Sequence, residues 1–226
     1  PPLTLNQFIK PDFAIFRVLQ LAEGPLHREA AVFFFDGAAS EIYTMRPGRP
    51  DWIEEELRYL GRTTKLLREN STAFLDMEWE PLISTCEDGV WGNRWRDGAK
   101  TVFTVFSLKP EGYKGPLVEV EVPEGAHLVS LWNHEELEPV EKEGRVYAPV
   151  DVAAFDAAKL GTRLEGNVDC VAVLPALLKV AADGELVTFE APGAPTGGRI
   201  AVSAGNPTYA EAPASFGTER RTIALH

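Results

Sequence analysis

The stretch AAVFFFDGAASEIYTM, residues 30–45, decides how the amino-terminal part of the chain is interpreted. Five apolar residues, 31–35, run without interruption into Asp36 and Gly37. An unbroken apolar run of this length is typical of a strand that is buried on both faces. We therefore predict a buried strand over 31–35. Asp36 is then either a turn former that binds backbone N–H groups or a functional carboxylate at the end of a strand.

Helical patterns flank this predicted strand. The segment 10–23 has apolar residues on one helical stripe and predicts a first helix, and 26–30 predicts a short helical piece. The strongest helix is predicted over 51–70, where apolar residues recur at steps of four and three. These residues are Ile53, Leu57, Leu60, Thr64 and Leu67. A buried strand, a loop and a long helix form the βα pattern of a parallel sheet or barrel.

From about Glu78 the hydrophobic period changes from 3.6 residues to two. Apolar or alternating runs of six to eight residues are separated by turn sequences such as DGAK, PEGA and EKEGR. This pattern predicts an antiparallel β-sandwich over 79–190, which includes a hairpin with Asp183-Gly184 as its turn. The Pro- and Gly-rich segment 191–199 is predicted to be a linker. Residues 200–226 are interpreted as the start of a further β domain.

Composition and charge narrow the classes of partner. The net charge of -12 and the pI of about 4.8 argue against a nucleic-acid partner and against an anionic membrane surface. No apolar run approaches the roughly 20 residues of a membrane-spanning helix. The four histidines are scattered without ligand spacing, so we predict neither a metal site nor a cofactor. Cys86 and Cys170 are either a disulfide, if the protein is exported, or two buried thiols in strands.

The two ends of the sequence suggest a longer protein. The chain begins with Pro1 rather than Met and has no start signature, and it stops within a strand-like run. We therefore expect the chain to have the rest of a parent protein as a partner. The compartment stays open, with a secreted or periplasmic location favoured over a cytoplasmic one.

Two segments together resemble the C-terminal end of large bacterial (β/α)8-barrel proteins related to glycoside hydrolases. They are AVFFFDGAASEIYTM (31–45) and LRENSTAFLDMEWEPLISTCEDGVWGNRWRDGAKTVFTVFS (67–107). The phrases that match in order are Phe34–Gly37, Leu67–Asn70, Trp79–Pro81, Gly89–Thr104 and Leu131–Leu137. The resemblance covers roughly residues 30 to 175. It implies that 1–78 is the end of a TIM-type barrel and that a β-sandwich follows.

The resemblance also implies a site. Active sites of such barrels lie at the carboxyl ends of the strands, so Asp36 becomes a candidate catalytic carboxylate. Glu41 and Tyr43 on the following loop, and Trp79 between two acids, become candidate sugar-binding residues. Each has a plainer interpretation: Asp36 as a turn residue, Glu41 as loop surface, and Trp79 as packing between barrel and sandwich.

The sequence therefore predicts the C-terminal part of a carbohydrate-active enzyme whose parent hydrolyses glycosidic bonds. That chemistry commonly needs two carboxylates that flank the bond, and the principal acids would stand on earlier strands. We expect the segment alone to be inactive and its partner in the parent to be a carbohydrate substrate. The alternative is a non-catalytic β-sandwich module that binds carbohydrate or serves as a scaffold. A third interpretation is an extracellular structural protein without a sugar ligand.

Overall fold

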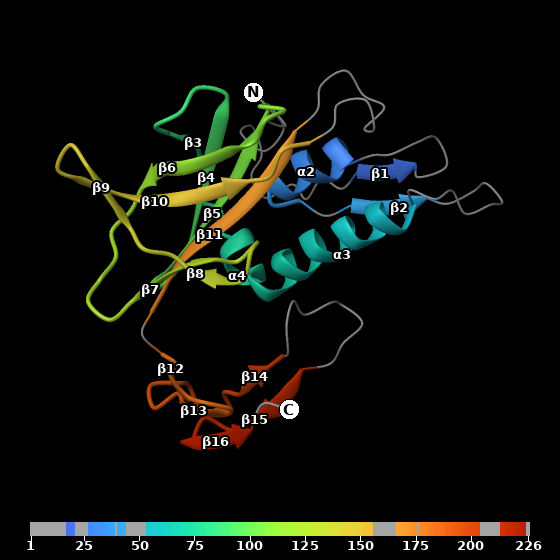
Figure 1. Cartoon of the computed structure of the whole chain (residues 1–226). Helices are drawn as coiled ribbons and strands as arrows, with labels where there is room; N and C mark the ends of the chain where they lie inside the picture. The colour runs from blue at the N-terminus through green and yellow to red at the C-terminus, as the bar shows by residue number, and fades with distance from the viewer. Residues whose placement is uncertain are drawn as a thin grey trace. The chain divides into compact units, whose positions relative to one another are not determined.

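The computed structural model describes residues 17–20, 27–38, 40–43, 53–155, 166–175, 177–203 and 213–224. The chain divides into two compact units, 1–174 and 175–226. The described residues lie mostly in antiparallel β sheets, and helices are few (Figure 1).

The first unit begins with a parallel strand pair that is connected through a helix. Its first elements are β1 (Arg17–Gln20), α2 (His27–Phe35), β2 (Ser40–Tyr43), α3 (Ile53–Glu69) and α4 (Ser71–Phe74). β1 and β2 run parallel, with Arg17 opposite Ser40 and Gln20 opposite Tyr43. Parallel strands need a crossover connection, and α2 provides it. This part of the chain is therefore a β–α–β unit, as the helix-and-strand pattern of the sequence indicated, but with different elements.

The predicted buried strand at 31–35 is wrong, because these residues form the second half of helix α2. A run of apolar residues also fits a helix that is enclosed on all sides. α2 meets this condition: Phe34 packs toward β5 and β11, whereas Ala30 packs against Leu60 of α3. The first predicted helix is also wrong where the structure describes it, since 17–20 is strand β1. The rest of that segment lies outside the described residues.

Asp36 and Gly37 end helix α2. The Ala38 N–H binds the Phe33 carbonyl at 2.9 Å and the Gly37 N–H binds the Phe34 carbonyl at 3.0 Å, which is the Schellman pattern of a helix C-terminus. Gly37 has φ +67°, and a Cβ there would lie 2.8 Å from Cη2 of Trp95. Only glycine therefore satisfies both the left-handed backbone and the close approach to Trp95.

Helix α3 confirms the predicted long helix but buries a different face. Leu60 is buried, whereas Leu57 and Thr64, predicted on the same face, are exposed. The buried positions are Glu56, Leu60, Thr63 and Leu66. The buried stripe is thus displaced by about one residue from the apolar pattern and includes two polar side chains. Glu56 lies beside His27, and the Thr63 hydroxyl donates to the Leu60 carbonyl. The predicted start at Asp51 and the side chain of Ile53 lie outside the described residues.

Two antiparallel sheets follow. The larger has the order β3 (Glu80–Ile83), β4 (Val90–Asp97), β5 (Lys100–Ser107), β11 (Asn167–Leu174), β7 (His127–Ser130) and β8 (Glu135–Glu136). The smaller has the order β6 (Tyr113–Glu119), β10 (Arg145–Val152) and β9 (Val140–Lys142). The predicted all-β character of this region is confirmed, since no helix occurs in its described residues after α4.

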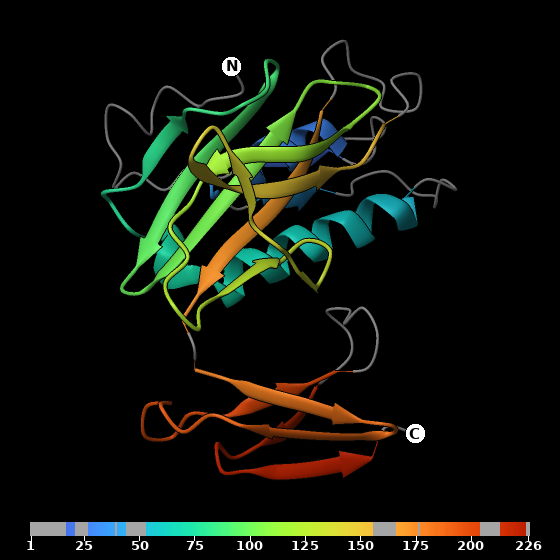
Figure 2. The same ribbon diagram turned by 60° about the vertical axis from the view of Figure 1, so that its left-hand side comes forward.

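The central strands of the larger sheet, β5 and β11, are buried on both faces. One face packs against the smaller sheet through an apolar layer that includes Phe103, Val105, Val118 and Val171. The other face packs against α2 and α4 through Trp95, Phe106 and Cys170, among others. Figure 2 shows the smaller sheet in front of the larger one and the helices behind it. Alternate residues of β5 and β11 therefore belong to two different cores.

The second unit contains its own small core. β12 (Lys179–Asp183), β13 (Leu186–Glu190) and β16 (Arg221–Ala224) form one sheet, and β14 (Ile200–Val202) and β15 (Ala214–Phe216) form another. Phe189, Ala191 and Ile200 are buried between them. The hairpin with Asp183-Gly184 at its turn exists as predicted. It pairs with β16, however, so it belongs with the carboxyl-terminal strands rather than with the predicted sandwich over 79–190.

The face of α3 is tested by two leucines. Leu60→Ala should lower the free energy of unfolding by about 2–5 kcal/mol, because it removes buried methyl groups at the contact with Ala30. Leu57→Ala is the matched control and should change it by less than about 0.5 kcal/mol. Urea unfolding measures both. Equal losses for the two variants would show that the buried face is not the one described.

Candidate functional site

The β–α–β unit has two distinct ends. Because α2 returns between two parallel strands, His27 at its start lies at the same end as Gln20 and Tyr43, the last residues of β1 and β2. Asp36 at the end of α2 lies at the opposite end, near the start of β2. Sites on parallel αβ units form at the carboxyl ends of the strands, so the candidate site is the end with Gln20 and Tyr43.

The structure does not bring together the four candidate site residues that were predicted from the sequence. Glu41 and Tyr43 both belong to β2 rather than to a loop, and Tyr43 is its last residue. Glu41 is exposed, and so is Ile42, at 44%. The side chain of Tyr43 lies outside the described residues. Asp36 and Trp79 are not at this end of the unit.

Asp36 does not lie at the end of a strand. The predicted position, at the carboxyl end of a barrel strand, on which its catalytic role was based, is therefore wrong. Asp36 is 0% exposed and follows the last turn of α2. Phe33, Phe34 and Phe35 are buried as well, so these residues do not form an exposed surface that further barrel strands would have to cover. The turn-forming alternative for Asp36 is the one that this geometry supports, although the turn ends a helix.

Trp79 is a packing residue at the junction of helices and sheet. Its ring stacks on Trp95 with centroids 4.4 Å apart and planes at 4°. Trp95 is 2% exposed and also contacts Phe74 of α4 edge to face. One face of the Trp79 ring is therefore already covered by Trp95, which leaves it poorly placed as an open platform for a sugar.

A buried polar cluster that the sequence analysis missed lies at the candidate end. The His27 ring packs against that of Tyr59 with centroids 3.6 Å apart and planes tilted by 36°. Its Nε2 is 3.4 Å from Oδ1 of Asn167. The Tyr59 hydroxyl donates to the same Oδ1 at 3.3 Å, and Nδ1 of His27 is 3.9 Å from Oε1 of Glu56. No spacing rule could find this group, because His27 and Asn167 are 140 residues apart.

Burial sets the protonation of this cluster. It lowers the pKa of His27, against the raising effects of the Asn167 hydrogen bond and the Glu55 charge. Burial also raises the pKa of Tyr59 well above its ordinary value. At neutral pH the cluster therefore holds a neutral imidazole and a neutral phenol beside Glu56. A neutral imidazole at this place can accept a proton, which an already protonated one cannot.

Asp169 is a second buried carboxyl that the sequence analysis did not single out. It lies on β11, 0% exposed, and accepts the backbone N–H groups of Asp151 and Cys170 at 2.8 and 2.7 Å. Burial raises its pKa to about 6, although these two hydrogen bonds lower it. Asp169 is a structural carboxyl in the interior, not part of an accessible site.

Other site classes find little support in the described part of the chain. Within it, no group of three or more His, Cys, Asp or Glu side chains is arranged to hold a metal ion. Cys86 and Cys170 are free, and burial raises the pKa of the Cys170 thiol well above its ordinary value. The structure has two separate thiols, but only Cys170, in β11, is buried in a strand as predicted, whereas Cys86 is partly exposed and lies outside the strands. Among these same residues, no helix is both long and apolar enough to cross a bilayer.

No model of a known protein family matches the chain, and no curated protein matches it. Solved structures do. An α-amylase from Anoxybacillus matches at 11% identity and a TM-score of 0.43 over 66% of this chain and 32% of its own. An α-amylase from Geobacillus thermoleovorans, complexed with acarbose, matches at 12% and 0.46 over 70% and 39%. The α-fucosidase of Thermotoga maritima matches at 12% and 0.37 over 71% and 39%. The chain thus spans between about a third and two fifths of the length of each of these proteins.

The pKa of Asp169 predicts a pH dependence of stability. Its pKa is about 6 in the folded protein, against 3.8 ordinarily. Below both pKa values the carboxyl is protonated in the folded and in the unfolded chain, so its burial as an acid does not change with pH there. As the pH rises from about 4 to 6, only the unfolded chain releases the proton. The free energy of unfolding should then fall by about 3 kcal/mol and stay lowered at higher pH.

Urea unfolding of Asp169→Asn between pH 4 and 7 measures this contribution. The difference between wild type and Asp169→Asn should change across the window by that amount, whereas exposed Asp88→Asn should follow the wild-type curve. A parallel pair of curves for wild type and Asp169→Asn would contradict the raised pKa.

Proposed function

We propose that the chain is the C-terminal part of a carbohydrate-active enzyme that hydrolyses glycosidic bonds with a pair of carboxylates. The order of elements supports this most strongly. A parallel β1–α2–β2 unit is followed by the long helix α3 and then by two antiparallel sheets that share an apolar layer. That order is what the end of a (β/α)8 barrel followed by a β-sandwich would produce. It also agrees with the sequence phrases that resemble such proteins.

In this proposal β1 and β2 are the last two strands of the barrel. The sugar cleft then passes over Gln20 and Tyr43, at the carboxyl ends of the strands. Glu41 and Tyr43 contribute contacts to sugar hydroxyls and to the sugar ring, and the principal catalytic acids stand on other strands. Asp36 is left out of the cleft, because it lies buried at the opposite end of α2.

The His27 cluster supports the loops at the same end. His27 begins α2 directly after the β1–α2 connection, and Glu56 lies in the first turns of α3 after the β2–α3 connection. Asn167 joins both helices to β11 through the contacts of His27 and Tyr59. In this proposal the cluster fixes where the two loops that border the cleft end, at the starts of α2 and α3.

The test compares two charge removals at opposite ends of the β–α–β unit. In the protein that carries the whole barrel, Glu41→Gln should lower kcat/KM on its glycoside roughly tenfold or more, chiefly through KM, because a charge-assisted hydrogen bond to substrate is lost. Asp36→Asn removes a charge of the same kind and should leave kcat and KM near wild type while it changes stability. Steady-state kinetics on aryl glycosides gives both numbers.

Three results would count against the proposal. If Asp36→Asn folds normally but lowers kcat/KM more than Glu41→Gln does, the cleft lies at the Asp36 end of the unit and the proposal is wrong about its position. Wild-type kinetics for Glu41→Gln and Tyr43→Phe together would remove β2 from the cleft. Absence of hydrolysis of every glycoside tried, in a folded protein with its barrel complete, would contradict the enzymatic function itself.

A further inference from the structure

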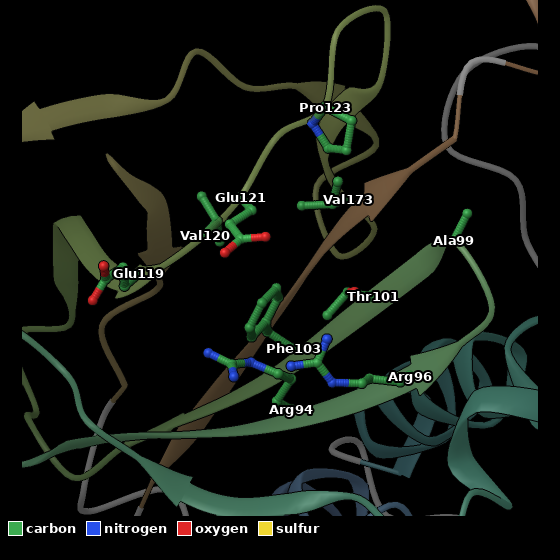
Figure 3. A pocket seen from close by; sticks show the side chains of 10 residues that line it. All are labelled: Arg94, Arg96, Ala99, Thr101, Phe103, Glu119, Val120, Glu121, Pro123 and Val173. Carbon is green, nitrogen blue, oxygen red and sulfur yellow. The ribbon is translucent and has the colours of Figure 1, made fainter. Parts of the chain in front are cut away.

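A pocket of about 280 Å³ in the first unit is lined by residues of both of its antiparallel sheets. It lies beside the turn that joins β4 to β5 and below the segment that follows β6 (Figure 3). Its lining comes from β4, β5, β6 and β11 and from that segment, and includes no residue of β1 or β2. The pocket is therefore separate from the proposed cleft.

The guanidinium groups of Arg94 and Arg96 form one side of the pocket, and both are bound by Glu80, which is not part of the lining. Arg94 Nη1 donates to both carboxylate oxygens of Glu80, at 3.2 and 3.0 Å. Arg96 donates through Nε and Nη2 to Oε1 of the same residue, at 3.3 and 3.0 Å. Burial alone would raise the pKa of Glu80, but the hydrogen bonds and charges of the two arginines lower it. Glu80 therefore stays ionised and orders both donors.

Carboxylates form the opposite side. Figure 3 shows Glu121 across the pocket from the two guanidinium groups, with the ring of Phe103 between them, and Glu119 to one side. Glu119 is itself bound by Arg145 at 3.1 Å. The lining thus carries two positive and two negative side chains. Its charge is balanced, so an ion of either sign gains little there, whereas a neutral ligand that both donates and accepts hydrogen bonds is well matched.

The remaining surface of the pocket is apolar. Phe103, Val120 and Val173 are each almost fully buried and contribute to the lining. A sugar residue combines the required features, because its hydroxyls donate and accept while its C–H face is apolar. The volume lies near the lower limit of about 300 Å³ for small-molecule sites, which suits one sugar unit rather than a chain.

We propose that this pocket binds a single neutral sugar residue, with Arg94 and Arg96 donating to its hydroxyls and Glu121 accepting from them. The class of ligand rests on the proposed function, but the site does not take part in bond cleavage. It would hold a saccharide to the β region of the molecule at a place other than the cleft.

The test is an NMR titration of the full 226-residue chain with the methyl glycosides of D-glucose, D-xylose and L-fucose, each used separately. At least one should shift the backbone amides of Thr101 and Glu121 in a saturable way. Glu121→Gln should weaken that binding by about tenfold, the effect of losing one charge-assisted hydrogen bond. Thr101→Phe, which places a ring in the pocket, should abolish it. Glu138→Gln, an exposed acid outside the pocket, is the matched control and should bind as wild type.

D-Glucuronate and inorganic phosphate are titrated in parallel. Tighter binding of either anion at these amides than of every neutral glycoside would overturn the proposal in favour of an anion site. No saturable shift at Thr101 and Glu121 with any neutral glycoside would overturn it as well, as would binding that is unchanged in both pocket variants. Unfolding curves of the variants establish that a loss of binding is not a loss of fold.

The outcomes of this test and of the test of the proposed function can be distinguished. Glu121→Gln should leave glycoside hydrolysis by the protein with its whole barrel unchanged, because Glu121 is not part of the cleft. Hydrolysis that depends on Glu41 without sugar binding at Glu121 would overturn the pocket alone. Sugar binding at Glu121 without any hydrolysis would overturn the enzymatic function and leave a carbohydrate-binding module.

Discussion

The carbonyl oxygen of Phe35 determines how the helices of the first unit sit on its larger sheet. The last carbonyls of a helix have no partner within it, and a buried one must find another donor. Here Asn93 Nδ2 donates at 2.9 Å and Thr104 Oγ1 at 2.7 Å, from the neighbouring strands β4 and β5. Both side chains are 0% exposed, and Thr104 also accepts from the indole of Trp95. Any displacement of α2 would leave these buried polar groups unsatisfied, so the end of α2 has one position on the sheet.

This attachment distinguishes the two ends of the β–α–β unit. The end with Phe35 and Asp36 is closed by the sheet, and Gly37 lets the chain turn against Trp95. The other end, with Gln20, His27 and Tyr43, is where the strands finish and the connections to both helices begin. The contacts of the Phe35 carbonyl thus lie at one end of the unit and the candidate site at the other.

Period-two alternation in the sequence predicted antiparallel strands such as β6, whose two faces differ in polarity, as with Val118 beside Glu119. The unbroken apolar run at 31–35 was misread as a buried strand, because a helix enclosed on every side has no polar face to reveal its period. The Gly37 that follows was a usable signal for a helix end. Nothing in the sequence could show that Asn93 and Thr104 would serve the Phe35 carbonyl, or that Asn167 would meet His27. Those contacts depend on tertiary placement across 58 to 140 residues.

Amide hydrogen exchange of the isosteric variant Thr104→Val tests the role of the Phe35 carbonyl most directly. The substitution keeps the shape and removes both the donor to Phe35 and the acceptor for Trp95. The amides of α2 should lose protection by about 1–3 kcal/mol, while those of the β5–β11 ladder should keep most of theirs. Unchanged protection of α2 in a folded Thr104→Val protein would contradict the claim that this contact positions the helix.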